Sequence, residues 1–290
     1  MFHHPRRPAL FAIVLLALAA PAATAAVRLA ASVLPLAGFA ERVGGERVRV
    51  QALVGPGQNP HSFEPTARQI EELTGAELFW RVGMPFEDAW IARLRAQSPG
   101  LRVLDARAVL ARPAPASEAR PGGGDHRHDH DPHVWTGPLQ VRAMVGDLAA
   151  ALAGLDPPNA AAYAANAQAF ARELEGLDAE LRQLLAPLRN RRFLVHHPAW
   201  GEFAAAYGLE QVAIERDGKE PGARSLAELA SQARRDGIRV IVVQPQTSAR
   251  SAQTLAREIG ARVVTVDPLA RDYAASLRAL ASALVEAAGP

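Results

Sequence analysis

The stretch of residues 159–189, NAAAYAANAQAFARELEGLDAELRQLLAPLR, decides how this chain is organised. Its apolar residues recur in alternating steps of four and three, which is the spacing of one face of a helix. They are Tyr163, Ala167, Phe170, Leu174, Leu177, Leu181, Leu184 and Leu188. We therefore predict one helix with a single buried stripe, about 40 Å long at roughly 1.5 Å per residue.

Both ends of this helix carry a sequence signal. Asn159 can cap its start after Pro157 and Pro158, and Pro187 removes an amide donor near its end. A coiled-coil arm or a bundle helix has a similar pattern, but strand and helix segments alternate on both sides of this one. That alternation favours a rigid helix that joins two lobes, with a cleft between them.

The flanking segments predict the α/β fold class: two lobes, each a mostly parallel sheet flanked by helices. Strands are expected at residues 27–32, 47–54, 77–82, 101–105, 192–196, 211–214, 238–243 and 262–266. Helices are expected at 34–43, 66–74, 86–96, 200–207, 225–235, 249–259 and 273–287. Capping boxes begin two of them, at Thr66 with Gln69 and at Ser225 with Glu228. The predicted domains are residues 26–156, the linking helix at 157–189, and residues 190–290.

Residues 1–25 have the layout of a secretory signal. Arg6 and Arg7 precede an apolar run, and the small residues Ala23, Thr24 and Ala25 offer a cleavage site. A membrane anchor is the alternative, but the run is shorter than the roughly 20 residues that cross a bilayer. We expect export, and because the chain has no cysteine, no lipid on a cysteine. The expected location is the periplasm.

Charge and cysteine content exclude several functions. Without the signal the chain has equal numbers of basic and acidic residues, 30 of each, and it has no polybasic patch, so we expect no nucleic-acid partner. The absence of cysteine excludes disulfides, thiolate ligands and cysteine nucleophiles. Residues 111–132 are rich in Pro and Gly and then alternate Asp and His, which predicts a loop outside the core.

Three histidines stand where strands end and helices begin. They are His61 in NPHSFEP, His133 in DPHVW and His197 in HHPAWGEF, and Asp267 in DPL also follows a predicted strand. Carboxyl ends of parallel strands open onto clefts. Three imidazoles and one carboxylate form a shell that suits Zn²⁺ better than calcium or magnesium. On spacing alone each could instead be an ordinary loop or turn residue, and His196 is expected to point away from His197.

These four motifs, in this order, resemble the periplasmic zinc- and manganese-binding proteins of bacterial ABC transporters, the cluster A-I solute-binding proteins. The resemblance runs from about Val27 to the C-terminus and includes the long helix. It implies that His61, His133, His197 and Asp267 bind the metal between two lobes, as the zinc-uptake type does. Histidine at the third position implies zinc, whereas glutamate there goes with manganese.

The resemblance also implies partners and an accessory element. The expected protein is a monomer that captures Zn²⁺ and delivers it to a membrane permease, without catalysis. His126, His128 and His130 stand where zinc relatives carry a His-rich loop, and we expect them to capture zinc weakly; an incidental solvated loop is the alternative. Because imidazole must be neutral to bind metal, affinity is expected to fall below about pH 6.

Other functions stay open at this point. The same fold serves manganese or iron carriers, and a periplasmic zinc chaperone or buffer would have the same residues. An exported zinc hydrolase would need an open coordination position and a base, for which Glu64 is the candidate. The role of Glu220, in KEPGA, is left open.

Overall fold

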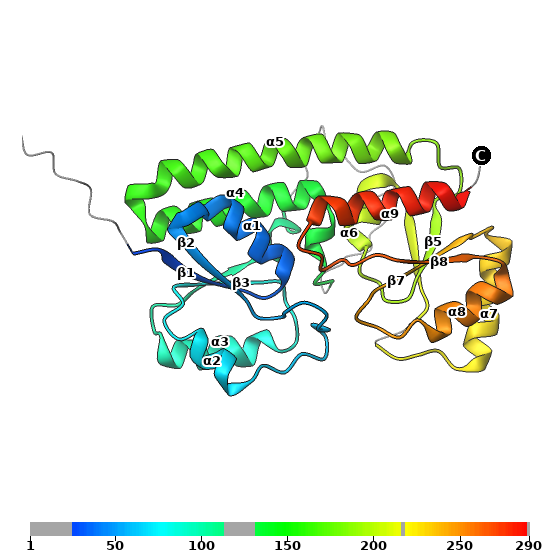
Figure 1. The fold of residues 1–290 in the computed structure, drawn as a ribbon, viewed down its shortest axis with the longest axis horizontal. Helices are drawn as coiled ribbons and strands as arrows, with labels where there is room; N and C mark the ends of the chain where they lie inside the picture. Colours follow the sequence, from blue (N-terminus) through cyan, green and yellow to red (C-terminus); the bar gives the residue numbers. More distant parts are fainter. Residues whose placement is uncertain (1–24, 113–130, 216–217, 289–290) are drawn as a thin grey trace, which may run out of the picture.

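The computed structural model describes residues 25–112, 131–215 and 218–288, which form two α/β lobes beneath one long helix (Figure 1). Each lobe holds a four-stranded sheet whose recorded strand pairings are all parallel. The predicted fold class is confirmed. The predicted signal at residues 1–25 and the histidines at 126, 128 and 130 lie outside the described residues, apart from Ala25.

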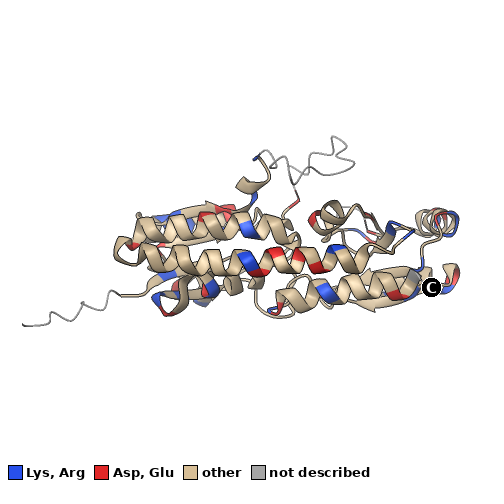
Figure 2. Ribbon diagram, turned by 90° about the horizontal axis from the view of Figure 1, so that it is seen from above, with Lys and Arg blue, Asp and Glu red and all other residues tan. Residues whose placement is uncertain are grey.

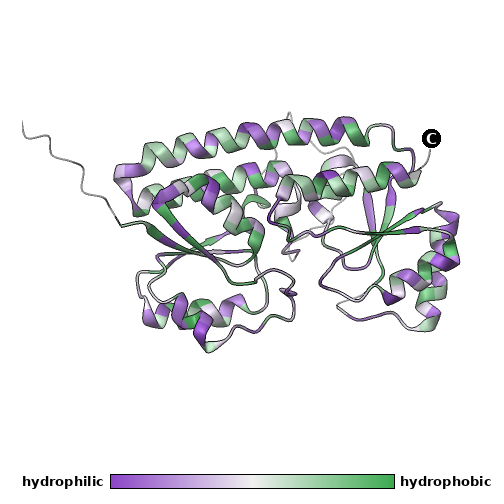
Figure 3. Ribbon diagram, viewed as in Figure 1, coloured by the Kyte–Doolittle hydropathy of each residue, from purple (hydrophilic) through white to green (hydrophobic). Residues whose placement is uncertain are grey.

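The two sheets share one strand order. In the N-terminal lobe the order is β2-β1-β3-β4, and in the C-terminal lobe it is β6-β5-β7-β8. Their bounds are β1 Val27–Ala31, β2 Val48–Ala52, β3 Leu78–Arg81, β4 Arg102–Asp105, β5 Arg192–Val195, β6 Glu210–Ala213, β7 Val240–Val243 and β8 Arg262–Thr265. The central strands are buried and apolar, as expected for parallel sheets covered on both faces (Figure 3).

Helices cover both faces of each sheet (Figure 1). They are α1 Leu34–Gly44, α2 Ala67–Glu72, α3 Glu87–Gln97, α4 Pro138–Leu155, α5 Ala160–Leu185, α6 Gly201–Tyr207, α7 Ala223–Arg235, α8 Arg250–Ile259 and α9 Tyr273–Ala288. Short 3₁₀ turns connect some of them, including η4 at Val134–Thr136 and η5 at Pro157–Asn159. No helix among the described residues is long and apolar enough to cross a membrane.

Helix α5 has the predicted buried stripe. From Tyr163 to Leu181 the predicted stripe residues are buried, and near the C-terminal end Leu185 is buried in place of the half-buried Leu184. The stripe packs on α4, α1 and α9, so one helix touches elements of both lobes. Its exposed side carries charged residues, among them Glu180, which pairs with Arg278 of α9 at 2.7 Å (Figure 2).

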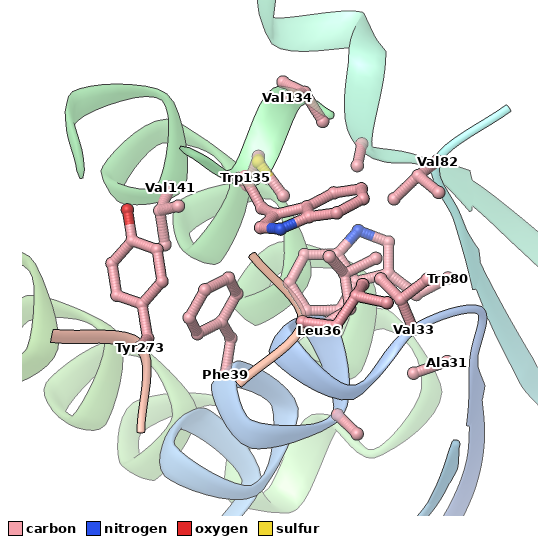
Figure 4. Packing of buried hydrophobic residues seen from close by; sticks show 14 of the residues in the cluster. Ala31, Val33, Leu36, Phe39, Trp80, Val82, Val134, Trp135, Val141 and Tyr273 are labelled. Carbon is pink, nitrogen blue, oxygen red and sulfur yellow. The ribbon is translucent and has the colours of Figure 1, made fainter. Parts of the chain in front are cut away.

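The largest hydrophobic cluster is continuous between the lobes. In Figure 4 Trp135 and Trp80 lie side by side with Phe39 and Tyr273 next to them. Phe39 of α1 and Tyr273 of α9 meet edge to face, with ring centroids 5.0 Å apart. Because a close-packed interior resists deformation, this shared core limits how far the two lobes can open.

Helix α4 is absent from the predicted elements. It buries Val141, Met144, Val145, Leu148 and Leu152 against α1 and α5, so its apolar spacing was present in the sequence. Pro138 begins the helix, where a missing amide costs no hydrogen bond. The boundary of the predicted N-terminal domain therefore has a packed helix on each side of it.

Two predicted caps are wrong, and one is confirmed. Helix α7 begins at Ala223 with Gly222 before it, so Ser225 lies inside the first turn. Asn159 precedes α5 but does not cap it, because η5 puts its backbone in a turn; its side chain bonds Arg47 and Asp156 instead. Thr66 and Gln69 do form the capping box of α2.

Candidate metal centre

The structure brings His61, His133 and His197 together from both lobes. His61 lies in the loop between β2 and α2, His133 directly before η4, and His197 in the turn between β5 and α6. The backbone amide of His61 donates to Asn59 Oδ1 at 2.9 Å, which fixes the local turn. His133 is buried, His197 is half-buried and His61 is exposed.

The three imidazoles converge through their Nε2 atoms. Nε2 of His133 is 3.2 Å from Nε2 of His61 and 3.3 Å from Nε2 of His197. Zinc held tetrahedrally at about 2.0 Å from each nitrogen would leave about 3.3 Å between neighbouring nitrogens. The two Nε2–Nε2 separations that involve His133 therefore match the edges of a zinc tetrahedron, and the ligand nitrogens of all three histidines lie within 4.8 Å of one another.

Carboxylates determine which nitrogen of two rings is free. Asp131 Oδ1 lies 2.7 Å from Nδ1 of His133 and also accepts from its backbone amide at 2.9 Å. Glu215 Oε1 lies in hydrogen-bond contact with Nδ1 of His197. Since an ionised carboxylate only accepts, each Nδ1 carries the proton, and each Nε2 keeps its lone pair for a metal.

The environment keeps the imidazoles of His61 and His197 neutral. Although the side chain of His61 is exposed overall, its ring is desolvated where it faces the other imidazoles, and this desolvation lowers its pKa to about 3, with contributions from His133 and His197. Burial and His133 likewise lower the pKa of His197, although Glu215 and Asp131 oppose the shift. Crowded imidazoles resist a proton because each added charge would face the others. The site is therefore prepared for a divalent cation before the cation arrives.

We expect zinc binding to persist in mild acid. An ordinary imidazole is only about 9% neutral at pH 5.5, so three such ligands would lose roughly 1000-fold in affinity relative to neutral pH. The lowered pKa values of His61 and His197 reduce the contribution of these two ligands to that loss, so the expected loss is well below 1000-fold. Titrations with zinc at pH 7.5 and 5.5 measure it; the full 1000-fold loss would contradict this prediction.

The same shifts affect stability without metal. Because the folded-state pKa lies below the unfolded value of about 6.5, the unfolded chain takes up more protons as the pH falls through 6.5. The metal-free protein should therefore lose stability between about pH 6.5 and the lower folded-state pKa. Thermal unfolding across this range is the check.

Asp267 belongs to the fourth motif in the sequence, but it is not part of the cluster that His61, His133 and His197 form. Its Oδ1 accepts from Nε2 of Gln246 at 2.8 Å and from the amide of Leu269 at 2.9 Å. Among the described residues, the group whose ligand atoms all lie within 4.8 Å of one another contains the histidines alone. The predicted role of Asp267 as fourth ligand remains a prediction.

The segments of His133 and Asp267 are joined across the lobes. Nε1 of the buried Trp135 donates to the carbonyl of Pro268 at 2.8 Å, between residues 133 positions apart. Each of these residues is a near neighbour in sequence of a predicted ligand. This hydrogen bond therefore ties the His133 turn of one lobe to the Asp267 turn of the other.

Sequence reasoning missed Asp131 and Glu215 as supporting residues. In the sequence analysis Asp131 was included only as part of the motif DPHVW. An Asp two positions before a histidine is nevertheless well placed to accept hydrogen bonds from Nδ1 and the backbone amide of that histidine. Glu215 had a weaker signal: it follows β6, which pairs in parallel with the strand before His197. Carboxyl ends of paired parallel strands lie at the same edge of a sheet, so the pairing of β5 with β6 brings the two residues together.

Gly201 provides a test of the Asp131 contact. A Cβ at Gly201 would lie 2.7 Å from Asp131 Oδ2, closer than such atoms pack. Gly201→Ala should therefore displace Asp131 from His133 and weaken zinc binding by roughly 10-fold, in the range of lost supporting carboxylates. Gly176→Ala, where the added Cβ meets nothing within 4 Å, is the matched control and should bind as the wild type. Equal affinities for both variants would refute the Asp131 role.

The match to known families agrees with this geometry. The model of the family described as zinc-uptake complex component A, periplasmic (ZnuA), matches residues 29–287. The chain belongs to the ZnuA family. That match covers both lobes, α5 and every residue of the candidate centre.

Individual known proteins are similar to this chain over most of its length. The high-affinity zinc uptake system protein ZnuA of Bacillus subtilis is 28% identical over 81% of the chain and 76% of that protein. The zinc-binding lipoprotein AdcA of Streptococcus pneumoniae is 29% identical over 81% of the chain but only 48% of its own length. The chain thus spans about half of the streptococcal relative. A crystal structure of ZnuA is 35% identical, with a TM-score of 0.81, over 91% of this chain and all of that one.

Proposed function

We propose that this protein binds Zn²⁺ tightly between its lobes and delivers it to the permease of an ABC transporter. The observation that carries the proposal is the convergence of three histidine Nε2 atoms, 3.2 and 3.3 Å apart, from both lobes. Membership in the ZnuA family supports transport as the purpose of that binding. Zinc is the cargo here, and the protein makes and breaks no covalent bond.

Each residue of the centre has a proposed role. His61, His133 and His197 bind the ion through Nε2, and Asp131 and Glu215 hold two of the rings in place. Asp267 completes the tetrahedron, which requires that its second carboxylate oxygen reach the ion while Gln246 and Leu269 hold the first. His126, His128 and His130 add weak capture outside this centre.

Location and assembly follow the same proposal. We propose that residues 1–25 direct export and that the protein carries no lipid on a cysteine, which the absence of cysteine from this sequence supports. The mature protein then works as a monomer in the periplasm. Since the hydrophobic core is shared between the lobes, release of zinc relies on local movement of the ligand loops rather than on wide opening.

Zinc is preferred over manganese because of the donor set. Three imidazoles suit zinc, whereas manganese favours sites richer in carboxylate oxygen. Because sites of nitrogen and oxygen ligands bind Zn²⁺ more tightly than Mn²⁺ or Fe²⁺, a manganese or iron carrier would be recognised by restored uptake of its own ion rather than by competition with zinc. A periplasmic zinc buffer or chaperone would bind zinc equally well but would not restore uptake through a permease.

An exported zinc hydrolase would need a water on the metal and a base near it. Glu64, the only base suggested by the sequence, is exposed. Loss of a hydrolytic activity in Glu64→Gln, with zinc binding kept, would favour the hydrolase over the carrier.

Competition titration with a zinc chelator tests the proposal. The mature chain from Ala26 should hold one tightly bound Zn²⁺. His197→Ala should remove that tight site, and deletion of residues 125–130 should leave it in place. Tight binding that survives His197→Ala but disappears with the deletion would overturn the proposed centre in favour of a flexible buffer.

A further inference from the structure

A chain of polar side chains runs from the candidate centre to the surface behind it. It starts at His197, passes through Glu215 and His196, and ends at Glu220. Glu215 and His196 are buried, whereas the side chain of Glu220 is 52% exposed. Neither His196 nor Glu220 has a role in the metal centre described so far.

Backbone hydrogen bonds fix the position of Glu215 in the chain beyond β6, but they do not fix the orientation of its side chain. Beyond the ends of β5 and β6, Ile214 N donates to Val195 O at 2.8 Å and Glu215 N donates to His196 O at 3.1 Å. This continued pairing holds Glu215 beside the two histidines. Its carboxylate then faces both rings, with Oε1 on Nδ1 of His197 and Oε2 3.7 Å from Nδ1 of His196.

The ring of His196 is held from its other side. Its Nε2 lies 3.0 Å from Oε1 of Glu220, which is hydrogen-bond distance, whereas 3.7 Å to Glu215 is too long for a hydrogen bond. Nδ1 of His196 has no hydrogen-bond partner among the described residues. Glu220 therefore sets the position of a buried ring that forms one wall beside the Glu215 carboxylate.

We propose that His196 and Glu220 are positioning residues: they keep Glu215 on His197 and thereby set the zinc affinity of the centre. The effect on zinc affinity rests on the proposed function, whereas the effect on the contact between Glu215 and His197 does not. Without the Glu220 contact, the His196 ring can turn, and Glu215 gains room to leave Nδ1 of His197. His197 would then lose the partner that keeps its Nε2 lone pair directed at the metal.

Glu220→Ala and Glu220→Gln separate position from charge. The amide oxygen of glutamine can still accept from Nε2 of His196, so Glu220→Gln should bind zinc within about twofold of the wild type. Glu220→Ala should bind several-fold to 10-fold more weakly, a smaller loss than removal of a direct supporting carboxylate. Glu228→Ala is the matched control, because among the described residues Glu228 forms an exposed pair with Arg224 in the same lobe, and the variant should bind zinc as the wild type does.

A second readout follows the hydrogen bond itself in the metal-free protein. With ¹⁵N-labelled histidine, the Nδ1 proton of His197 should give a protected resonance in the wild type and in Glu220→Gln. In Glu220→Ala this resonance should broaden through exchange with water, while the thermal midpoint changes little. A general loss of stability in Glu220→Ala would lower the thermal midpoint and would affect more resonances than that of the His197 Nδ1 proton.

The two measurements, zinc affinity and the His197 Nδ1 resonance of the metal-free protein, distinguish failure of this inference from failure of the proposed function. If the wild type binds zinc and Glu220→Ala matches it in affinity and in the His197 resonance, the positioning role is wrong and the carrier function stands. If the wild type binds no zinc, the carrier function is wrong. In that case an unchanged His197 resonance in metal-free Glu220→Ala still overturns the positioning role.

Discussion

Replacing His133 with alanine is expected to weaken zinc binding by roughly 100- to 1000-fold. Structural zinc sites bind with roughly 10–16 kcal/mol, so one of four ligands accounts for about 2.5–4 kcal/mol. His133 is central, because its Nε2 is the atom close to both of the other two Nε2 atoms, and it is 4% exposed. We expect its loss to exceed that of the exposed His61.

Chelator competition measures the affinity, and circular dichroism confirms that the variant is folded. Glu64→Gln is the control: it changes an exposed residue three positions from His61 and should bind zinc as the wild type. A His133→Ala protein with affinity within 10-fold of the wild type would show that the zinc lies elsewhere.

Trp135→Ala is expected to have the largest effect on stability, about 3–5 kcal/mol. Trp135 is fully buried, packs beside Trp80 in the core shared by both lobes, and contacts His133 with ring centroids 5.4 Å apart (Figure 4). Its truncation leaves a cavity and also leaves the carbonyl of Pro268 without its donor. Chemical denaturation of the metal-free protein measures the cost.

Trp135→Phe separates the two parts of this loss. Phenylalanine fills most of the space but cannot donate to Pro268, so the variant should lose about 1–3 kcal/mol, the cost of an unpaired buried acceptor. Because that bond joins the His133 turn to the Asp267 turn, the variant should also bind zinc more weakly. If Trp135→Phe is as stable as the wild type and binds zinc equally well, the bond does not align the two turns.

The sequence predicted most elements because their signals are local. The stripe of α5 and the capping box of α2 depend on residues within one helix, and the structure has both. Helix α4 has an equally local stripe, from Val141 to Leu152, but it was not predicted. It follows a Pro- and Gly-rich region that predicts a loop. The caps at Asn159 and Ser225 were wrong because tertiary contacts and an earlier helix start decided them.

The candidate centre was predicted less completely than the fold. His61 and His197 follow β2 and β5, at the edge where parallel sheets place functional side chains, whereas His133 stands directly before η4, and the structure brings all three together. The carboxylate partners were harder to find because they depend on contacts between segments. Glu215 meets His197 through the pairing of β6 with β5, and Glu220 meets His196 across 24 positions. Neither contact is visible in residue spacing.

X-ray absorption at the zinc edge is the most direct test of the central claim. The sample is the protein that lacks residues 125–130, loaded with one equivalent of Zn²⁺. The loop histidines then cannot contribute to the spectrum. The account predicts three imidazole nitrogens at about 2.0 Å and one oxygen ligand. A spectrum with one imidazole or none would contradict it, because zinc would then lie outside the centre formed by His61, His133 and His197.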